Sequence, residues 1–127
     1  MDPLVNALNT ILSHEDRHWK ECIICPASNL VSRVLRLMQS KGYLGEIEFI
    51  DDGRQGKFRV QLFGRINDCK AVRPRYSANV KALEKYEKRF LPSRNMGTLI
   101  VSTPNGILSH EDAKDQNVGG RILAYVY

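Results

Sequence analysis

The sequence predicts an α+β protein made of two small lobes. Its 127 residues suffice for one domain or two small lobes. Hydrophobic patterns of helix type and of strand type alternate along the chain, and a polar, turn-like segment at 64–70 interrupts them near the middle. We therefore expect an N-terminal α+β lobe over residues 1–66 and a C-terminal lobe over residues 67–127. With 43% hydrophobic residues, the chain can bury a core and is not expected to be disordered.

Two helices separated by a short strand are predicted at the start of the N-terminal lobe. Asp2 and Pro3 have the character of an N-cap and a first helical residue, and apolar residues at helical spacing follow them. Ser28 is the expected N-cap of the second helix, and Gly42 is its expected stop. The expected elements are a helix to about Ser13, a strand over 21–25 and a helix between Ser28 and Gly42.

A β-hairpin is predicted to complete this lobe. Residues 46–51 and 57–63 alternate between polar and apolar side chains, and a loop rich in Asp and Gly joins them. In the second run, Lys57 and Arg59 alternate with apolar residues. One face of this strand is therefore expected to join the core and the other to be basic. The lobe is expected to run helix, strand, helix, hairpin.

The C-terminal lobe is predicted to be mostly β. Ser109, followed three residues later by Asp112, predicts the start of a short helix, which Gly119-Gly120 is expected to break. A turn is expected at Pro104-Asn105-Gly106. The expected elements are a helix over about 79–90, a strand over 98–102, a short helix from Ser109, and a closing strand over 121–127 with alternating side chains.

One hexapeptide, Ile-Leu-Ser-His-Glu-Asp, occurs twice, at 11–16 and at 107–112. The surrounding patterns place the first copy at the end of a helix and the second across a strand and a helix start. Six residues do not make a structural repeat, so we treat the two copies as unrelated in structure.

Positive charge is concentrated in the middle of the chain. The formal net charge is +5, but residues 1–52, 53–94 and 95–127 carry −3, +9 and −1. Such a segment favours a polyanionic partner, and nucleic acid is the default expectation. Part of the charge has another explanation, because the four cations between residues 81 and 89 recur at helical spacing beside two glutamates. They also fit an ordinary solvated helix face.

Other functions lack their sequence patterns. No apolar run is long enough for a membrane span and no signal-peptide pattern opens the chain, so we expect a soluble intracellular protein without a membrane partner. Walker, GxGxxG and nucleophile-elbow patterns are absent from the sequence, and the Ser-His pairs at 13–14 and 109–110 have no recognisable catalytic context. We expect no enzyme, no catalytic residue and no cofactor.

A zinc site is the strongest alternative chemistry. His14, His18, Cys22 and Cys25 follow one another at spacings that a zinc site could use. Cys22 and Cys25, however, fall in a predicted strand, where side chains three residues apart point to opposite faces. Three cysteines are also too few for a disulfide scaffold and are expected to be reduced thiols. No metal is therefore expected, and a zinc-dependent interaction module is a distant possibility.

Several segments resemble one family of proteins, in the order in which that family has them. The family is small-subunit ribosomal protein eight, and the upstream segments look like its archaeal and eukaryotic cytosolic branch. The matching segments are KGYLGE at 41–46, GRIN at 64–67, PRY at 74–76, LPSR at 91–94, GTLIVSTPNGIL at 97–108 with Ala113-Lys114 after it, and GGRILAYVY at 119–127.

The resemblance implies a structural component of the small ribosomal subunit that binds the central domain of the small-subunit ribosomal RNA. Such a protein supports subunit assembly and translation, and its fold has two α+β lobes. In the family the loop corresponding to Ser102–Gly106 contacts an irregular RNA helix, since short hydroxyls and glycine let backbone approach sugar, phosphate and base edges. Here Pro104 replaces the usual third hydroxyl, and Ser28-Asn29 replaces the usual Ser-Lys. A free RNA-binding translational regulator is the alternative.

From the charge pattern and the resemblance together we expect a cytosolic ribosomal location and RNA contacts centred on the C-terminal lobe. The expected partners are the ribosomal RNA and neighbouring small-subunit proteins, and no homo-oligomer is expected. We expect the Thr103 hydroxyl to meet RNA and to add little to stability, and we find no clear series of stacking aromatic residues. The expected RNA-binding residues are Ser102, Thr103, Asn105, Gly106, Gly119, Gly120, Arg73, Arg75, Tyr76, Arg54, Lys57, Arg59, Arg94, Ser28 and Arg33.

Overall fold

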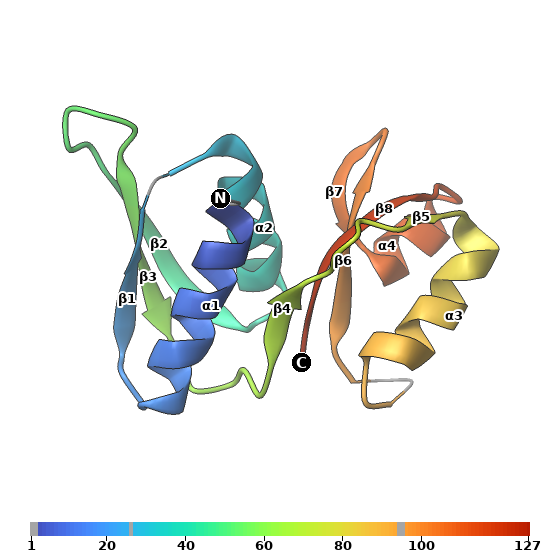
Figure 1. Ribbon diagram of the computed structural model, residues 1–127, viewed down its shortest axis with the longest axis horizontal. Helices are drawn as coiled ribbons and strands as arrows, with labels where there is room; N and C mark the ends of the chain where they lie inside the picture. The colour runs from blue at the N-terminus through green and yellow to red at the C-terminus, as the bar shows by residue number, and fades with distance from the viewer. Residues whose placement is uncertain (1–2, 26, 94–95) are drawn as a thin grey trace. The chain divides into compact units, whose positions relative to one another are not determined.

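The structure of the protein, a computed structural model, describes residues 3–25, 27–93 and 96–127 (Figure 1). The chain divides into two compact units, which we name the N-terminal unit, Met1–Asn67, and the C-terminal unit, Asp68–Tyr127. Both units combine helices with an antiparallel sheet, so the predicted α+β fold class is confirmed. Within the described ranges, none of the helices combines the length and the apolar character that crossing a membrane requires.

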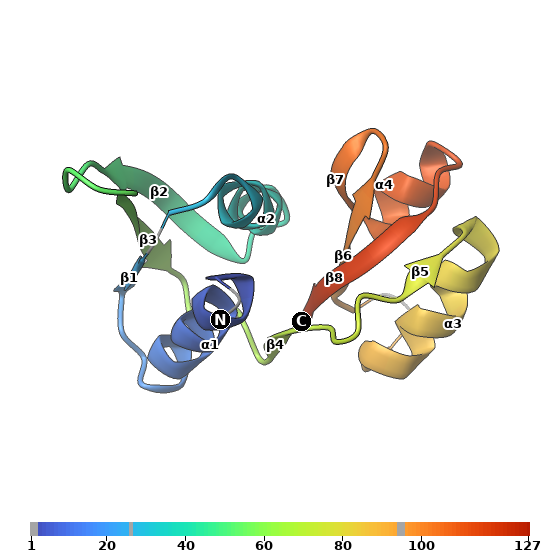
Figure 2. The ribbon, with the colours of Figure 1, turned by 45° about the horizontal axis from the view of Figure 1, so that its top comes forward.

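The N-terminal unit is a three-stranded sheet with two helices on one of its faces. The strand order is β1-β3-β2, and both strand pairs are antiparallel. In both views α1 and α2 lie on the same side of this sheet, where their apolar faces pack on it (Figures 1 and 2). The elements are α1 (Pro3–Asp16), β1 (Glu21–Ile24), α2 (Asn29–Ser40), β2 (Leu44–Ile50) and β3 (Lys57–Leu62).

Local signals account for most of the boundaries in this unit. Ser28 caps α2 as predicted, because its Oγ accepts a hydrogen bond of 3.2 Å from the Val31 N–H. Gly42 has a φ of +85° just after the helix, a conformation that glycine adopts without steric cost. The first helix runs beyond its predicted end at Ser13 to Asp16, and His18 with φ +59° then turns the chain. Its predicted cap, Asp2, lies outside the described residues.

The predicted hairpin of β2 and β3 is confirmed, and its loop is held by one carboxylate. Asp52 Oδ1 accepts hydrogen bonds of 3.0 Å from the N–H groups of both Arg54 and Gly56. Gly56 has a φ of +85°, and the Phe49 ring lies where a Cβ on Gly56 would be. Only glycine therefore fits at this end of the hairpin.

The outer face of this sheet, which the helices do not cover, differs from the prediction. Arg59 of β3 lies directly opposite Glu48 of β2 and forms an ion pair with it at 3.4 Å. Glu21 and Glu46 flank the same face around Gln61. The predicted alternation within β3 is confirmed, with Phe58, Val60 and Leu62 buried. The face of the assembled sheet is nevertheless of mixed charge rather than basic, because the neighbouring strands contribute carboxylates that the alternation within β3 could not show.

The C-terminal unit is built around one long strand. β8 pairs with β4, β5 and β6, and β7 adds to the outer side of β6. The helices α3 and α4 pack together and against this sheet, with Leu83, Leu99 and Ile122 fully buried between them. The elements are β4 (Cys69–Ala71), β5 (Ser77–Ala78), α3 (Val80–Phe90), β6 (Thr98–Thr103), β7 (Gly106–Ser109), α4 (His110–Asp115) and β8 (Gly120–Val126).

The short helix α4 begins as predicted and ends earlier than predicted. Ser109 Oγ accepts a hydrogen bond of 3.1 Å from the Asp112 N–H, which confirms the N-cap. The helix ends at Asp115, where Asn117 with φ +55° takes the left-handed conformation that closes many helices. Gly119-Gly120 therefore does not break this helix and has another role.

The closing strand β8 does not alternate as predicted. Ile122, Leu123 and Ala124 are all buried. Ile100 faces Ala124 while its neighbour Val101 faces Ile122, so Leu123 is an extra residue, and a β-bulge results. The Leu123 carbonyl accepts a hydrogen bond of 2.9 Å from the Val72 N–H. The bulge changes which side chains share a face, and period-two alternation could not predict it.

Gly119 and Gly120 allow three backbone segments to meet where β8 begins. A Cβ on Gly119 would collide with the Ala78 carbonyl and the Asn79 backbone at the end of β5. A Cβ on Gly120 would collide with the Ser102 carbonyl of β6. Because backbone atoms in paired strands cannot move aside cheaply, both positions require glycine.

Replacing Gly120 with Ala should lower the free energy of unfolding by about 3 kcal/mol, because the new Cβ overlaps the backbone of a paired strand. Gly53→Ala is the matched control, since a Cβ there would meet nothing within 4 Å and only the positive φ of +78° opposes it. The control should cost about 1 kcal/mol. Thermal and urea unfolding of both variants measure this. Equal losses would show that the close approach at Gly120 does not matter.

Glu15 is a buried carboxyl near the end of α1. Its residue is 5% exposed, and its Oε1 has no hydrogen-bond partner among the described residues. Burial raises the pKa of Glu15 above its ordinary value, although the Gly64 backbone N–H and His18 oppose the shift. The folded state therefore binds a proton at Glu15 more tightly than the unfolded chain does, and the ionised side chain reduces stability near neutral pH.

Glu15→Gln should therefore raise the free energy of unfolding near pH 7, by on the order of 1 kcal/mol, because a neutral amide removes the cost of a buried charge. The gain should shrink as the pH falls through the raised pKa of Glu15, where the native carboxyl is itself protonated. Urea unfolding of both proteins at about pH 7 and about pH 4 tests this. A gain that is the same at both pH values would contradict it.

Candidate nucleic-acid interface

A shallow groove in the C-terminal unit brings together several of the predicted site residues. It lies where the end of β6, the start of α3 and the start of β8 meet, and it is an open hollow with a volume of about 700 Å³. The close approach at Gly119 and Gly120 shapes its floor, because no side chain stands there. Its lining residues are Ser77, Ala78, Asn79, Val80, Ser102, Thr103, Pro104, Asn117, Gly119, Gly120 and Arg121.

A row of three polar side chains crosses the sheet at this groove. Arg121 of β8 lies directly opposite both Ser77 of β5 and Ser102 of β6. Directly opposed residues share a face, so the Arg121 side chain leaves the sheet between the two serines. Ser77 and Arg121 are exposed and Ser102 is half-buried. Across residues 3–25, 27–93 and 96–127, the Ser102 hydroxyl has no hydrogen-bond partner and is available to a ligand.

Thr103 and Asn105, by contrast, hold the turn in its shape. The Thr103 hydroxyl donates a hydrogen bond of 2.8 Å to the Gly106 carbonyl and accepts one of 3.1 Å from the Asn105 N–H. The Asn105 side-chain amide donates to Gln116 Oε1 at 3.0 Å. The expectation that the Thr103 hydroxyl adds little to stability is therefore wrong. The Thr103 hydroxyl oxygen keeps one unused lone pair, which is available to a ligand.

Gly106 leaves the backbone of this turn open to approach. It has a φ of +112°, and a Cβ placed on it would meet nothing within 4 Å. The carbonyl and amide groups of the turn can therefore come close to a ligand without an intervening side chain. Backbone that is accessible in this way can read sugar and phosphate positions.

The N-terminus of α3 opens into the same groove. Asn79 Oδ1 caps it by accepting from the Ala82 N–H at 2.8 Å, and Asn79 and Val80 both line the groove. The first turn of α3 contains no acidic residue. The positive end of the helix dipole is thus not neutralised locally and favours a phosphate.

The remaining predicted residues of the C-terminal unit have different positions. Arg73 and Arg75 are exposed in the segment between β4 and β5. Tyr76 stacks on Tyr86 with a centroid separation of 5.4 Å, and the Arg89 guanidinium lies 5.1 Å from its ring centre. Tyr76 is thus engaged within the protein. Arg94 lies outside the described residues.

Tyr76 is one end of a series of stacked rings that the sequence reading did not find. Each ring in the series stacks on the next, at centroid separations from 5.4 to 6.4 Å. Tyr125 donates a hydrogen bond to Asp68 Oδ2 at 3.1 Å, and burial is the main cause that raises its pKa to about 12. The rings come from three separate segments, so sequence spacing could not reveal them. They are Tyr76, Tyr86, Phe90, Tyr125 and Tyr127.

The predicted residues of the N-terminal unit do not belong to this groove, which consists of C-terminal residues. The Ser28 hydroxyl is occupied as the cap of α2, and Arg33 is exposed on that helix. Arg54 is exposed in the hairpin loop, and Lys57 begins β3. Arg59 is paired with a glutamate, as described above. Of these five, Arg59 has the environment least suited to phosphate.

The four candidate zinc ligands do not form a cluster. Cys22 is buried within β1, whereas Cys25, the residue that follows this strand, is exposed. The thiol of Cys22 has its pKa raised to about 12, chiefly by burial, so it stays protonated near neutral pH. His14 Nδ1 instead lies 2.8 Å from the Thr10 carbonyl. In the part of the chain that the structure describes, no group of three or more His, Cys, Asp or Glu side chains could hold a metal ion.

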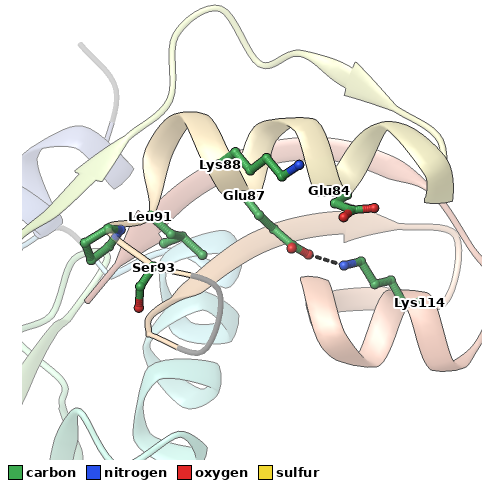
Figure 3. A pocket seen from close by; sticks show the side chains of 7 residues that line it. Glu84, Glu87, Lys88, Leu91, Ser93 and Lys114 are labelled. Atoms are coloured by element: carbon green, nitrogen blue, oxygen red, sulfur yellow. Dashed lines mark ion pairs between the residues drawn. The ribbon is translucent and has the colours of Figure 1, made fainter.

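A second hollow lies between α3 and α4, with a volume of about 360 Å³ (Figure 3). Glu87 of α3 points toward Lys114 of α4 and forms an ion pair with it. His110 Nδ1 accepts a hydrogen bond of 3.0 Å from the Leu99 N–H, so its proton sits on Nε2, which lies 3.6 Å from Glu87 Oε1. These contacts tie α3, α4 and β6 together, which is a structural role.

Several lining residues of the groove were not expected from the sequence, and two of them, Arg121 and Ser77, belong to the polar row. Arg121 directly follows the two glycines in the sequence. This position could have identified it as a candidate phosphate-binding residue, because a cation beside an open backbone suits a phosphate. Ser77 had no such signal, since only the pairing of β5 with β8 places it beside Arg121.

Comparison with known protein families identifies the family of this chain. The model of the family described as ribosomal protein S8 matches residues 2–127, which is essentially the whole chain. Proteins of this family are structural rather than catalytic, and they bind ribosomal RNA within the small ribosomal subunit. The chain, with its two α+β units, therefore belongs to the ribosomal protein S8 family.

Proposed function

We propose that this protein binds the central domain of the small-subunit ribosomal RNA directly, through the groove of its C-terminal unit, and thereby supports subunit assembly and translation. The row of Ser77, Arg121 and Ser102 beside an open turn carries the proposal. An arginine flanked in the sheet by two serines offers a cation for a phosphate, and the serine hydroxyls offer hydrogen-bond donors and acceptors beside it. We place this activity in the cytosolic ribosome, acting together with neighbouring small-subunit proteins.

The groove suits folded, irregular RNA better than a regular duplex or a free single strand. Its open backbone and short hydroxyls can approach 2′-hydroxyls and displaced base edges. The aromatic rings of this unit stack on one another, whereas sequence-tolerant strand binders present rings to successive bases. We therefore expect a central-domain RNA fragment to bind far more tightly than poly-uridine.

A free translational regulator would use the same groove on messenger RNA. Sedimentation of cell extracts through a gradient at moderate salt separates the two functions. A ribosomal component should migrate with small subunits, and a free regulator should remain near the top of the gradient. Contacts to the central-domain RNA can then be mapped by crosslinking in cells and sequencing of the crosslinked nucleotides.

Ser102→Ala should weaken binding of the central-domain fragment by about 1–3 kcal/mol while binding to unrelated RNA stays the same, because the hydroxyl is available to read the RNA. Stability should be unchanged, since this hydroxyl has no partner in the described protein. Thr103→Val is the informative comparison and should lower the unfolding free energy by about 1 kcal/mol, because it removes both hydrogen bonds of the turn. If Ser102→Ala weakens the binding of both RNAs equally, the Ser102 hydroxyl takes no part in RNA readout.

Arg121→Ala should weaken cognate and unrelated RNA together, because a phosphate contact carries no sequence information. The slope of log affinity against log salt should become shallower by about 0.7 to 0.9. Arg59→Ala serves as the control, since Arg59 is already paired with Glu48, and it should leave the slope as in the native protein. An unaltered slope for Arg121→Ala would place Arg121 outside the RNA contact.

A further inference from the structure

The outer face of the N-terminal sheet carries exposed apolar side chains among its charges. Cross-strand pairing aligns Ile23, Arg59 and Glu48 in one row. Glu21 lies opposite Gln61 in the next row, where Gln61 also accepts a hydrogen bond from the Glu46 N–H. Because the helices cover only the other face, no element among the described residues of the N-terminal unit packs on this face.

Ile23 and Phe63 are the apolar anchors of this face. Ile23 is 42% exposed and Phe63 is 47% exposed, although large apolar residues are normally covered. The Phe63 ring and the Gln61 side chain lie over Gly45, where a Cβ would collide with both. The Arg65 guanidinium lies 4.9 Å from the Phe63 ring centre. Aromatic and arginine side chains held in this way are typical of protein interfaces.

The charges that line a groove of this face disfavour RNA. A shallow groove of about 310 Å³ is lined by three carboxylates against two cations, and one of these cations, Arg59, is already paired. The chain as a whole carries a net charge of +5, so a groove with more carboxylates than cations is unusual for this protein. Phosphate would be repelled by the carboxylates, whereas Lys or Arg side chains would find partners. The lining residues are Lys20, Glu21, Glu46, Glu48, Arg59 and Gln61.

We propose that this face docks another protein, through a segment that carries Lys or Arg side chains beside an apolar residue. The apolar residue packs on Ile23 and Phe63, and the cations meet Glu21, Glu46 and the free side of Glu48. The surface belongs to the N-terminal unit and the RNA groove to the C-terminal unit, so the proposal goes beyond RNA binding and can fail independently of it.

Photocrosslinking tests the proposal in assembled particles. Benzoylphenylalanine replaces the exposed Ile23 in the full chain, small subunits containing this protein are purified and irradiated, and the crosslinked species is digested and sequenced. The expected product is a protein whose crosslinked segment contains Lys or Arg. A crosslink to RNA, a crosslink to a segment without cations, or no crosslink would each overturn the proposal.

Charge reversal provides the second measurement. The double variant Glu21→Lys with Glu46→Lys, made in the crosslinking protein, should lower the yield of that product at least about tenfold, because like charges then face each other. Glu111→Lys with Asp115→Lys changes the net charge equally on exposed positions of α4 and should leave the yield unaltered. An equal loss of crosslinking yield in both variants would show that this face is not a docking surface.

Affinity for the central-domain RNA fragment, measured for both double variants, keeps the two proposals distinguishable. Both variants should bind that fragment at least as well as the parent protein, because added positive charge does not oppose RNA binding. Retained RNA binding with a lost crosslink supports a separate protein surface. Weakened RNA binding by the sheet variant alone would instead make this face part of the RNA interface and overturn the proposal.

Discussion

The close backbone approach at Gly119 and Gly120 is the constraint on which the C-terminal unit depends. These residues let β8 start directly against β5 and β6. With a side chain at either position, the central strand of the sheet could not take its register, and Arg121 would not stand between Ser77 and Ser102. The proposed RNA groove is therefore a direct consequence of the packing that forms the sheet, and its floor is bare because glycine is needed there.

Neighbouring hydroxyls in this groove have divided roles. Thr103 uses both its donor and one lone pair to close the turn, whereas Ser102 keeps its hydroxyl for a ligand. A turn that is fixed internally presents its open backbone in one conformation and loses less entropy on binding. The two halves of the chain also differ in electrostatics. Carboxylates from β1 and β2 lie around Arg59, while the described residues that line the groove at Arg121 and the start of α3 include no acidic one.

Local sequence signals predicted much of this fold. The caps at Ser28 and Ser109, the hairpin around 51–56 and the α+β class follow from interactions within a few residues of each other. The sequence also predicted that Ser102 and Gly106 belong to a polar, open turn. Cross-strand relations were not predictable in this way. The bulge at Leu123, the ion pair of Arg59 and the row through Arg121 depend on pairing between strands far apart in the chain.

The repeated hexapeptide Ile-Leu-Ser-His-Glu-Asp shows which features the local sequence determines and which features depend on the tertiary structure. At 11–16 all six residues are helical, and His14 contacts the Thr10 carbonyl of its own helix. At 107–112 the first three residues are strand, and His110 is buried with its ring bonded to the Leu99 N–H of β6. The flanking patterns in the sequence already indicated a helix end for one copy and a strand followed by a helix for the other. Only the tertiary structure decided what each histidine touches, because six identical residues have the same local preferences and differ only in the partners that folding places beside them.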